Sequence, residues 1–165
     1  MDNETATSLS VRPADEADID AIGRINQTVQ RLHAELEPEL FKAVTDEVEV
    51  SAYFAAQLSA PQHQFRVAEI DGLIAGYVWF EKQETADTPF TFPTRRFYVH
   101  HIAVDTAARR RGVASALLRN IEAEARAEGI TKLVLATWAT NQVAQAFFTS
   151  QSFRPFILML QKNFV

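Results

Sequence analysis

The sequence of 165 residues contains no cysteine. Disulfide bonds, thiolate metal ligands and a cysteine nucleophile are therefore excluded, and the composition fits a reducing compartment. Any acid–base or group-transfer chemistry must use other side chains.

Positive charge and long apolar runs are also scarce. The 16 Lys and Arg residues against 21 Asp and Glu residues give a net charge of −5, so the chain lacks the positive excess that drives nucleic-acid binding. No stretch approaches the roughly 18 apolar residues of a membrane span, and the polar, acidic start "MDNETATSLS" is unlike a secretory signal. We expect a cytoplasmic protein with neither a nucleic-acid partner nor a membrane partner.

A hydrophobic content of 47% over this length suits one domain with a substantial core. We expect a short tail over residues 1–8 and a single domain over residues 9–165. A strand from Leu9 to Pro13 precedes an amphipathic helix that starts at Asp15 and Glu16. An acidic connector then leads to a second helix near Val48 to Leu58.

The rest of the chain alternates between strand and helix patterns. Two apolar runs flank Asp71-Gly72, a pair that suits a tight hairpin turn. The strand "RRFYVHHIAVD" leads into the helix "GVASALLRNIEAEARAEG", and a buried strand at about Ile130 to Trp138 follows. A short helix from Asn141 and a last strand at Phe153 to Lys162 complete an α/β fold, with a mixed central sheet flanked by about four helices.

The stretch "ARRRGVASALL" sets three arginines and a glycine directly before a helix. Backbone N–H groups at a helix start lack partners, and the helix dipole is positive there. Gly112 and Ala114 leave room for a ligand, and the arginines supply charge for phosphate oxygens. The spacing is neither that of a P-loop nor that of a dinucleotide-binding motif.

The run from Arg109 to Ala114 resembles the Arg/Gln-x-x-Gly-x-Gly/Ala element of the GCN5-related N-acetyltransferase (GNAT) family. Downstream, "NQVAQAFFTSQSF" is similar to that family's Asn-x-x-Ala-x-x-x-Tyr-x-x-x-Gly-Phe segment. The resemblance extends from Leu9 to Lys162 and implies a single-domain GNAT-like fold. Three positions depart from the family pattern: Thr106 replaces a common proline, Ser152 a glycine and Phe148 a tyrosine.

The resemblance implies acetyl-coenzyme A as co-substrate, with no metal. Its pyrophosphate would lie on the arginine loop and its pantetheine arm beside the preceding strand. The predicted cofactor contacts are Ile102, Ala103, Val104, Arg109, Arg110, Arg111, Gly112, Val113, Ala114, Ser115, Asn141 and Phe148. For Asn141, a purely local role as a helix cap stays open.

An acceptor amine must lose a proton before it attacks, because a lysine-like amine titrates near ~10.4. In a regular strand, His100 and His101 point to opposite faces, so at most one faces the acceptor and the two cannot share a metal. We favour His100, which would share a face with Tyr98 and Ile102, although a structural role for either histidine stays open. Phe148 cannot donate a proton, which leaves Tyr98, Tyr77 or water as the acid. The predicted catalytic residues are His100 and Tyr98.

The function expected from the resemblance is acetyl transfer to a primary amine, by direct attack in a ternary complex. The acceptor is a small-molecule amine or a protein or peptide amine. The glutamates around His33 hint at a cationic one, and a solvated acidic loop stays open as the simpler explanation of these residues. The alternative is a non-catalytic sensor module that binds acyl-coenzyme A. A homodimer stays open as a mode of assembly.

Overall fold

Five strands form one mixed sheet in the computed structural model, which describes residues 8–164. The predicted tail therefore lies, except for Ser8, outside the described residues. The sheet order follows the chain: β1 (Leu9–Pro13), β2 (His63–Ile70), β3 (Leu73–Thr85), β4 (Thr94–Val104) and β5 (Leu133–Leu135). The first four strands pair antiparallel, and β5 lies parallel to β4. The predicted mixed sheet is confirmed.

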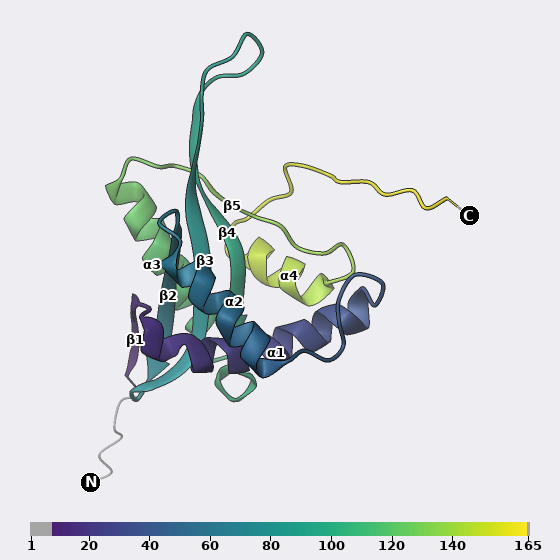
Figure 1. Cartoon of the computed structure of the whole chain (residues 1–165). Helices are drawn as coiled ribbons and strands as arrows, with labels where there is room; N and C mark the ends of the chain where they lie inside the picture. The colour runs from purple at the N-terminus through teal and green to yellow at the C-terminus, as the bar shows by residue number, and fades with distance from the viewer. Residues whose placement is uncertain (1–7, 165) are drawn as a thin grey trace.

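Helices cover both faces of this sheet (Figure 1). They are α1 (Ile19–Leu36), α2 (Glu47–Ser59), α3 (Val113–Ala127) and α4 (Gln142–Ser150). The helices α1 and α2 pack on one face and α3 on the other, while α4 adds apolar side chains at the edge of the α3 side. Within residues 8–164, no helix combines the length and apolar character that a membrane crossing requires.

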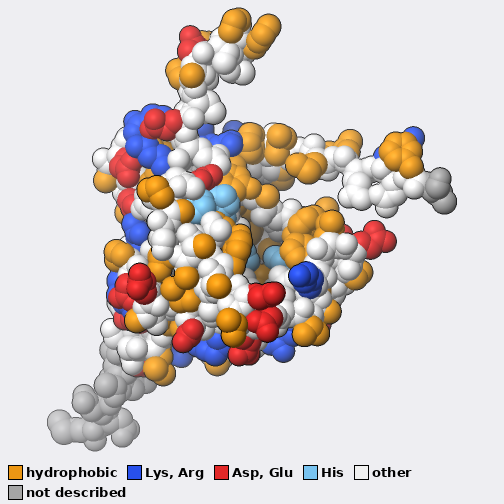
Figure 2. Space-filling model, in the orientation of Figure 1, with side chains coloured by type: hydrophobic (Ala, Val, Ile, Leu, Met, Phe, Trp, Pro, Cys, Tyr) orange, Lys and Arg blue, Asp and Glu red, His pale blue; other side chains and the backbone are white. Residues whose placement is uncertain are grey.

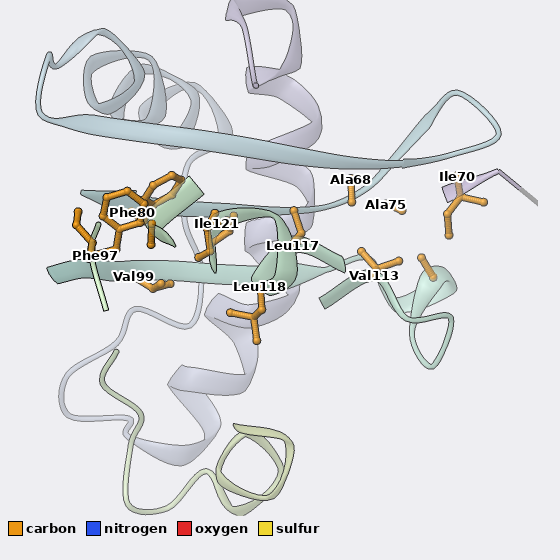
Figure 3. Close-up of a cluster of buried hydrophobic side chains, with 14 residues drawn as sticks. Ala68, Ile70, Ala75, Phe80, Phe97, Val99, Val113, Leu117, Leu118 and Ile121 are labelled. Atoms are coloured by element: carbon orange, nitrogen blue, oxygen red, sulfur yellow. The ribbon is translucent and has the colours of Figure 1, made fainter. Parts of the chain in front are cut away.

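The central strand β3 is buried from both sides because its side chains alternate between two cores. Val78 and Phe80 pack on the α3 side with Phe97 and the leucines of α3 (Figure 3). Tyr77 and Trp79 pack on the other side with residues of α1 and α2. Burial on both faces explains the nearly continuous apolar run of this strand.

The predicted hairpin turn is confirmed. Asp71 and Gly72 have φ values of 52° and 79°, as a tight primed turn requires. The first helical segment also begins where its acidic residues predicted: Asp15 accepts a hydrogen bond from the Ala17 N–H at 2.9 Å. Together these two turns fix the positions of β2, β3 and α1.

The predicted last strand, Phe153 to Lys162, is wrong for the chain as described. Residues 153–164 form neither helix nor strand, and the segment leaves the body of the molecule beside α4 (Figure 1). A strand needs hydrogen bonds from a neighbour, and no described strand lies beside this segment. The strand expected at about Ile130 to Trp138 is also shorter, because only Leu133–Leu135 pair with β4.

Gly76 in β3 allows the start of α3 to lie close to the sheet. A methyl group at this position would lie 2.7 Å from Val113 Cγ1 and 2.8 Å from the Ala103 carbonyl oxygen. Because Val113 is the first residue of α3, this glycine controls how closely the helix start approaches β3 and β4.

We expect Gly76→Ala to lower the free energy of unfolding by about 1–3 kcal/mol, because the added methyl forces Val113 or the β4 backbone to move. The control is Gly23→Ala in α1, where the methyl would meet Ser51 Oγ at an ordinary 3.6 Å. Urea denaturation of both variants and the parent measures the difference. Equal stability of Gly76→Ala and the parent would contradict the close approach.

Candidate cofactor and acceptor site

The strands β4 and β5 separate after a short paired stretch. Phe97–Val99 pair with Leu133–Leu135, but β4 continues to Val104. In the part of the chain that the structure describes, no strand lies along that edge of β4 from His100 onward. The backbone edge there is open to an extended ligand that carries hydrogen-bonding amides.

The start of α3 lies at the end of this open edge and carries free donors. Gly112 is the N-cap residue, with φ 80°, and no side chain caps the helix. Among residues 8–164, no protein acceptor is within hydrogen-bond distance of the N–H groups of Val113, Ala114 or Ser115. A helix start with three free N–H groups is suited to an anion.

The three arginines of the loop are exposed and available to a ligand. Arg110 has φ 64°, in the left-handed region. Within the described residues, no carboxylate forms a salt bridge with Arg109, Arg110 or Arg111. The loop therefore adds positive charge beside the free N–H groups of α3, which suits a diphosphate.

Asp105 anchors the beginning of this loop. Its N–H donates to the Ala75 carbonyl at 2.8 Å, and its carboxylate accepts from the Ala107 N–H at 3.0 Å. The same carboxylate pairs with Arg24 of α1. The Arg24 guanidinium, with the Ala107 N–H, holds the pKa of Asp105 below its usual range. These contacts tie the loop to β3 and α1.

A β-bulge in β4 places both adjacent histidines on the same face of the sheet. Trp79 pairs with His101 and the next residue, Phe80, pairs with Val99, so His100 is an extra residue. The His100 ring stacks on Trp79 at 4.6 Å and His101 Nδ1 lies 2.6 Å from Tyr77 Oη. The prediction that the two histidines face opposite sides is therefore wrong, because the bulge interrupts the alternation.

The bulge also changes which residues accompany His100. Tyr98 does share its face, with ring centroids 5.0 Å apart, but Ile102 packs on the α3 side. The prediction that His100 shares a face with Tyr98 is thus confirmed, and the prediction that it shares a face with Ile102 is wrong. Ala103 is buried on the α1 and α2 side, and Val104 packs on the α3 side. Because the side chains of Ile102, Ala103 and Val104 pack into the two cores, a ligand can reach these residues only at the backbone edge of β4.

A second histidine and a glutamate complete a cluster around His100. The Glu81 carboxylate lies between the two histidines, 3.3 Å from His100 Nε2 and 3.5 Å from His63 Nε2. Burial lowers the pKa of His100, and Glu81 partly offsets this effect. The three side chains bring atoms of metal-binding type within 4.8 Å of one another, and the predicted absence of a metal stays a prediction. Sequence analysis missed His63 and Glu81, which only the strand register brings together.

His101 lies deeper, in a polar pocket of its own. Burial, with nearby His33, lowers its pKa to about 4, so it is neutral at pH 7. Asn26 Nδ2 donates to Tyr77 Oη at 3.2 Å, which leaves the hydroxyl proton of Tyr77 for His101 Nδ1. We therefore assign the single ring proton to Nε2. In this tautomer His101 has no free lone pair with which to accept a proton.

Aromatic residues from three segments lie next to one another beside His101, whose ring centroid is 6.4 Å from that of His33. His33 of α1 lies 4.8 Å from Phe41, and Phe41 lies 5.3 Å from Trp138, both measured between ring centroids. Thr140 donates to Glu37 at 2.7 Å and ties the end of α1 to the segment after β5. Figure 2 shows histidine side chains beside a hollow with hydrophobic borders. A separate cleft of about 530 Å³ between α1 and α2 contains none of the predicted site residues.

The remaining predicted contacts are Asn141, the N-cap of α4, and Phe148 within the helix. Asn141 accepts from the Ala144 N–H at 3.1 Å and caps the helix, so its local role is confirmed and its contact with a cofactor stays a prediction. Phe148 is half-buried and packs against Phe153 at 5.5 Å. It contributes an apolar surface and no proton.

Comparisons with known proteins identify a family and a shared fold. The sequence profile of the Acetyltransferase (GNAT) family matches residues 28–153. The fold is similar to that of a mutant of the BH1408 protein from Bacillus halodurans, with a TM-score of 0.88 and 18% identity over 94% of this chain and 99% of that one. A predicted acetyltransferase from Clostridium acetobutylicum, solved with acetyl-CoA, has a TM-score of 0.68 and 19% identity over 94% and 96% of the two chains.

A third similar structure is the aminoglycoside N-acetyltransferase AAC(6')-Iy in complex with CoA. It has a TM-score of 0.65 and 16% identity, over 97% of each chain. No curated protein matches the sequence significantly. The structural similarities therefore concern the fold, and the sequence profile concerns the family.

The depressed pKa of His101 predicts a loss of stability in acid. The unfolded chain takes up this proton near pH ~6.5, whereas the folded chain does so only near pH 4. Stability therefore falls as the pH falls through this interval, by on the order of 3 kcal/mol. In His101→Gln this side chain does not titrate, so the variant should lose less free energy of unfolding over the same pH interval. Urea unfolding of both proteins across the interval measures the difference, and parallel losses would show that His101 is not buried as a neutral ring.

Proposed function

The chain belongs to the acetyltransferase (GNAT) family, and from this premise we propose that it transfers the acetyl group of acetyl-coenzyme A to a primary amine, by direct attack in a ternary complex. The observation that carries the proposal is the open edge of β4 that ends at the uncapped start of α3. An acidic, cysteine-free chain makes nucleic-acid binding and a covalent cysteine intermediate poor alternatives.

In this proposal the cofactor lies along two backbone surfaces. The pyrophosphate accepts from the N–H groups of Val113, Ala114 and Ser115, and the loop arginines add charge-assisted hydrogen bonds. The amides of the pantetheine arm pair with the β4 edge at residues 102–104. Complexes of two similar structures with acetyl-CoA and with CoA support this assignment. Residue 112 must then stay small, because the diphosphate passes directly over it.

The proposed reaction forms a C–N bond and breaks the C–S bond of the thioester. The neutral amine attacks the carbonyl carbon, and N–H groups along the β4 edge stabilise the negative charge on its oxygen. The tetrahedral intermediate then expels the coenzyme A thiolate. Phe148 gives no proton to this thiolate, but a thiol pKa of ~8.5 makes it a tolerable leaving group. Tyr98, which lies beside His100, is the candidate donor.

His100 is the proposed acceptor of the proton that the amine loses. Its side chain is 27% exposed, and Glu81 stabilises the imidazolium that forms. His101 is less suited, because Tyr77 occupies its Nδ1. Glu81 and His63 act through His100 and are positioning residues in this scheme.

The environment of the histidines supports a cationic acceptor. Phe41 and Trp138 offer aromatic faces, Glu37 supplies negative charge beside them, and Glu81 supplies negative charge beside His100. Both small amines and the amines of peptides fit this description. The cytoplasmic location and the lack of a nucleic-acid partner stay predictions from the sequence.

We expect Gly112→Glu to weaken coenzyme A binding at least tenfold, because a carboxylate would lie against the diphosphate. Gly72→Glu is the matched control. Gly72 has φ 79°, close to the φ of 80° at Gly112, and a Cβ added at either position would meet no atom within 4 Å. Backbone strain is therefore equal, but Gly72 lies in the β2–β3 turn. Calorimetric titration should show a loss at position 112 alone, and equal affinities would remove the loop from the site.

Acetyl transfer to a panel of amines tests the function itself. We expect free coenzyme A and acetylated amine from the parent, and a kcat lower by roughly 10²-fold or more in His100→Gln. Because burial lowers the pKa of His100, the acidic limb of the parent kcat profile should lie below pH ~6.5 and flatten in the variant. Arg95→Gln, at an exposed position of β4, controls for the fold, and a chelator excludes a metal contribution.

Two outcomes would contradict the proposal. Tight binding of acetyl-coenzyme A without transfer to any amine would favour the sensor module. An acetylated protein that passes its acetyl group to amine at a competent rate would replace the ternary complex with a covalent route.

A further inference from the structure

Three side chains from adjacent strands converge beside the bulge in β4. His63 is the first residue of β2, Glu81 is its partner in β3, and His100 is the extra residue of β4. Their ligand atoms lie within 4.8 Å of one another, and no second group of three such side chains among residues 8–164 converges in this way. Because all three residues belong to paired strands, the sheet backbone fixes their spacing.

The distances within this cluster suit a shared metal ion better than hydrogen bonds. Glu81 Oε1 lies 3.3 Å from His100 Nε2, and Oε2 lies 3.5 Å from His63 Nε2. Both distances are longer than the ~2.9 Å that is usual for an N–H···O bond. Two ligands that each lie about 2.0 Å from a tetrahedral zinc ion are about 3.3 Å apart. The carboxylate therefore stands at the spacing of a metal ligand from each imidazole.

Hydrogen bonds do not explain why the His63 ring is buried. Its side chain is only 11% exposed, yet its Nδ1 atom has no hydrogen-bond partner in the described part of the chain. Burial of an imidazole without such a partner costs free energy. A bond from Nε2 to a metal ion would offset this cost.

A chain of polar contacts holds the glutamate in place from behind. Gln83 Nε2 donates to Glu81 Oε1 at 2.6 Å, and Arg96 Nε donates to Gln83 Oε1 at 2.9 Å. Outer contacts of this kind orient the carboxylate ligands of metal ions. The side chain of Glu81 is therefore held in the direction of the two histidines before any ion binds.

Trp79 supplies an apolar wall, and the other side of the cluster is open to solvent. The indole packs against both imidazoles, with ring centroids 5.1 Å from His63 and 4.6 Å from His100. His100 is the most accessible of the three ligands, and histidine side chains are visible on the molecular surface (Figure 2). An ion can thus enter past His100, and water can reach a position that no protein atom fills.

We propose that His63, Glu81 and His100 bind a zinc ion, with water in the remaining coordination position. Two imidazole nitrogens and one carboxylate oxygen form a ligand set that zinc uses where one position stays open. Magnesium and calcium are poorer candidates, because they take oxygen ligands. The proposal departs from the absence of a metal that the family resemblance implies. It goes beyond the proposed acetyl transfer and does not depend on it.

Calorimetric titration of the untagged, chelator-treated protein with zinc chloride tests the site. We expect one zinc ion per chain, and a dissociation constant at least about tenfold higher in His63→Gln and in Glu81→Gln, because each variant loses one of three ligands. His33→Gln is the matched control, since it removes a histidine outside the cluster and should keep the parent affinity. Urea denaturation without metal shows that each variant is folded.

Tryptophan fluorescence places the ion. The chain has two tryptophans, so Trp138→Phe leaves Trp79 as the single indole. Cobalt(II), a paramagnetic substitute for zinc, should quench the Trp79 emission with one ion per chain, and adding His63→Gln to this variant should remove the effect at the same concentration.

Three results would overturn the proposal. The first is a parent that binds no zinc at micromolar concentrations. The second is equal zinc affinity in the parent, His63→Gln and Glu81→Gln, which would place the ion elsewhere. The third is magnesium binding as tight as zinc binding, which would show attraction to surface carboxylates and no imidazole ligands.

Discussion

The site depends on the limited pairing between β4 and β5. The two strands share three residue pairs, from Phe97 to Val99, and then separate while β4 continues. If the pairing extended to Val104, the backbone edge would be closed by hydrogen bonds and no ligand amide could reach it. The separated edge can form a site with the free N–H groups of α3 only because α3 starts at the same end of the sheet. Gly76 permits the start of α3 to lie close to β3 and β4, and Asp105 anchors the loop between β4 and α3.

One extra residue in β4 then separates the roles of two adjacent histidines. Both face the α1 and α2 side, yet their surroundings differ in polarity and access. Burial keeps His101 neutral, and the Tyr77 hydroxyl occupies its Nδ1. His100 lies nearer to solvent, with Glu81 beside it. A regular strand would have placed one of the rings on the α3 side, in the larger apolar core. The bulge thus gives the α1 and α2 side of the sheet two imidazoles with different proton affinities.

Local signals in the sequence predicted most of the fold and the exposed arginine loop before α3. The Asp71-Gly72 turn, the helix stripes and the glycine at the start of α3 each act within a few residues, so a single sequence carries them. The register between strands cannot be predicted in the same way, because it depends on β-bulges. Simple counting from the hairpin turn pairs His63 with Phe80, but a shift between Ala68 and Glu69 pairs it with Glu81. The His63, Glu81 and His100 cluster therefore rests on two irregularities that have no clear sequence signature.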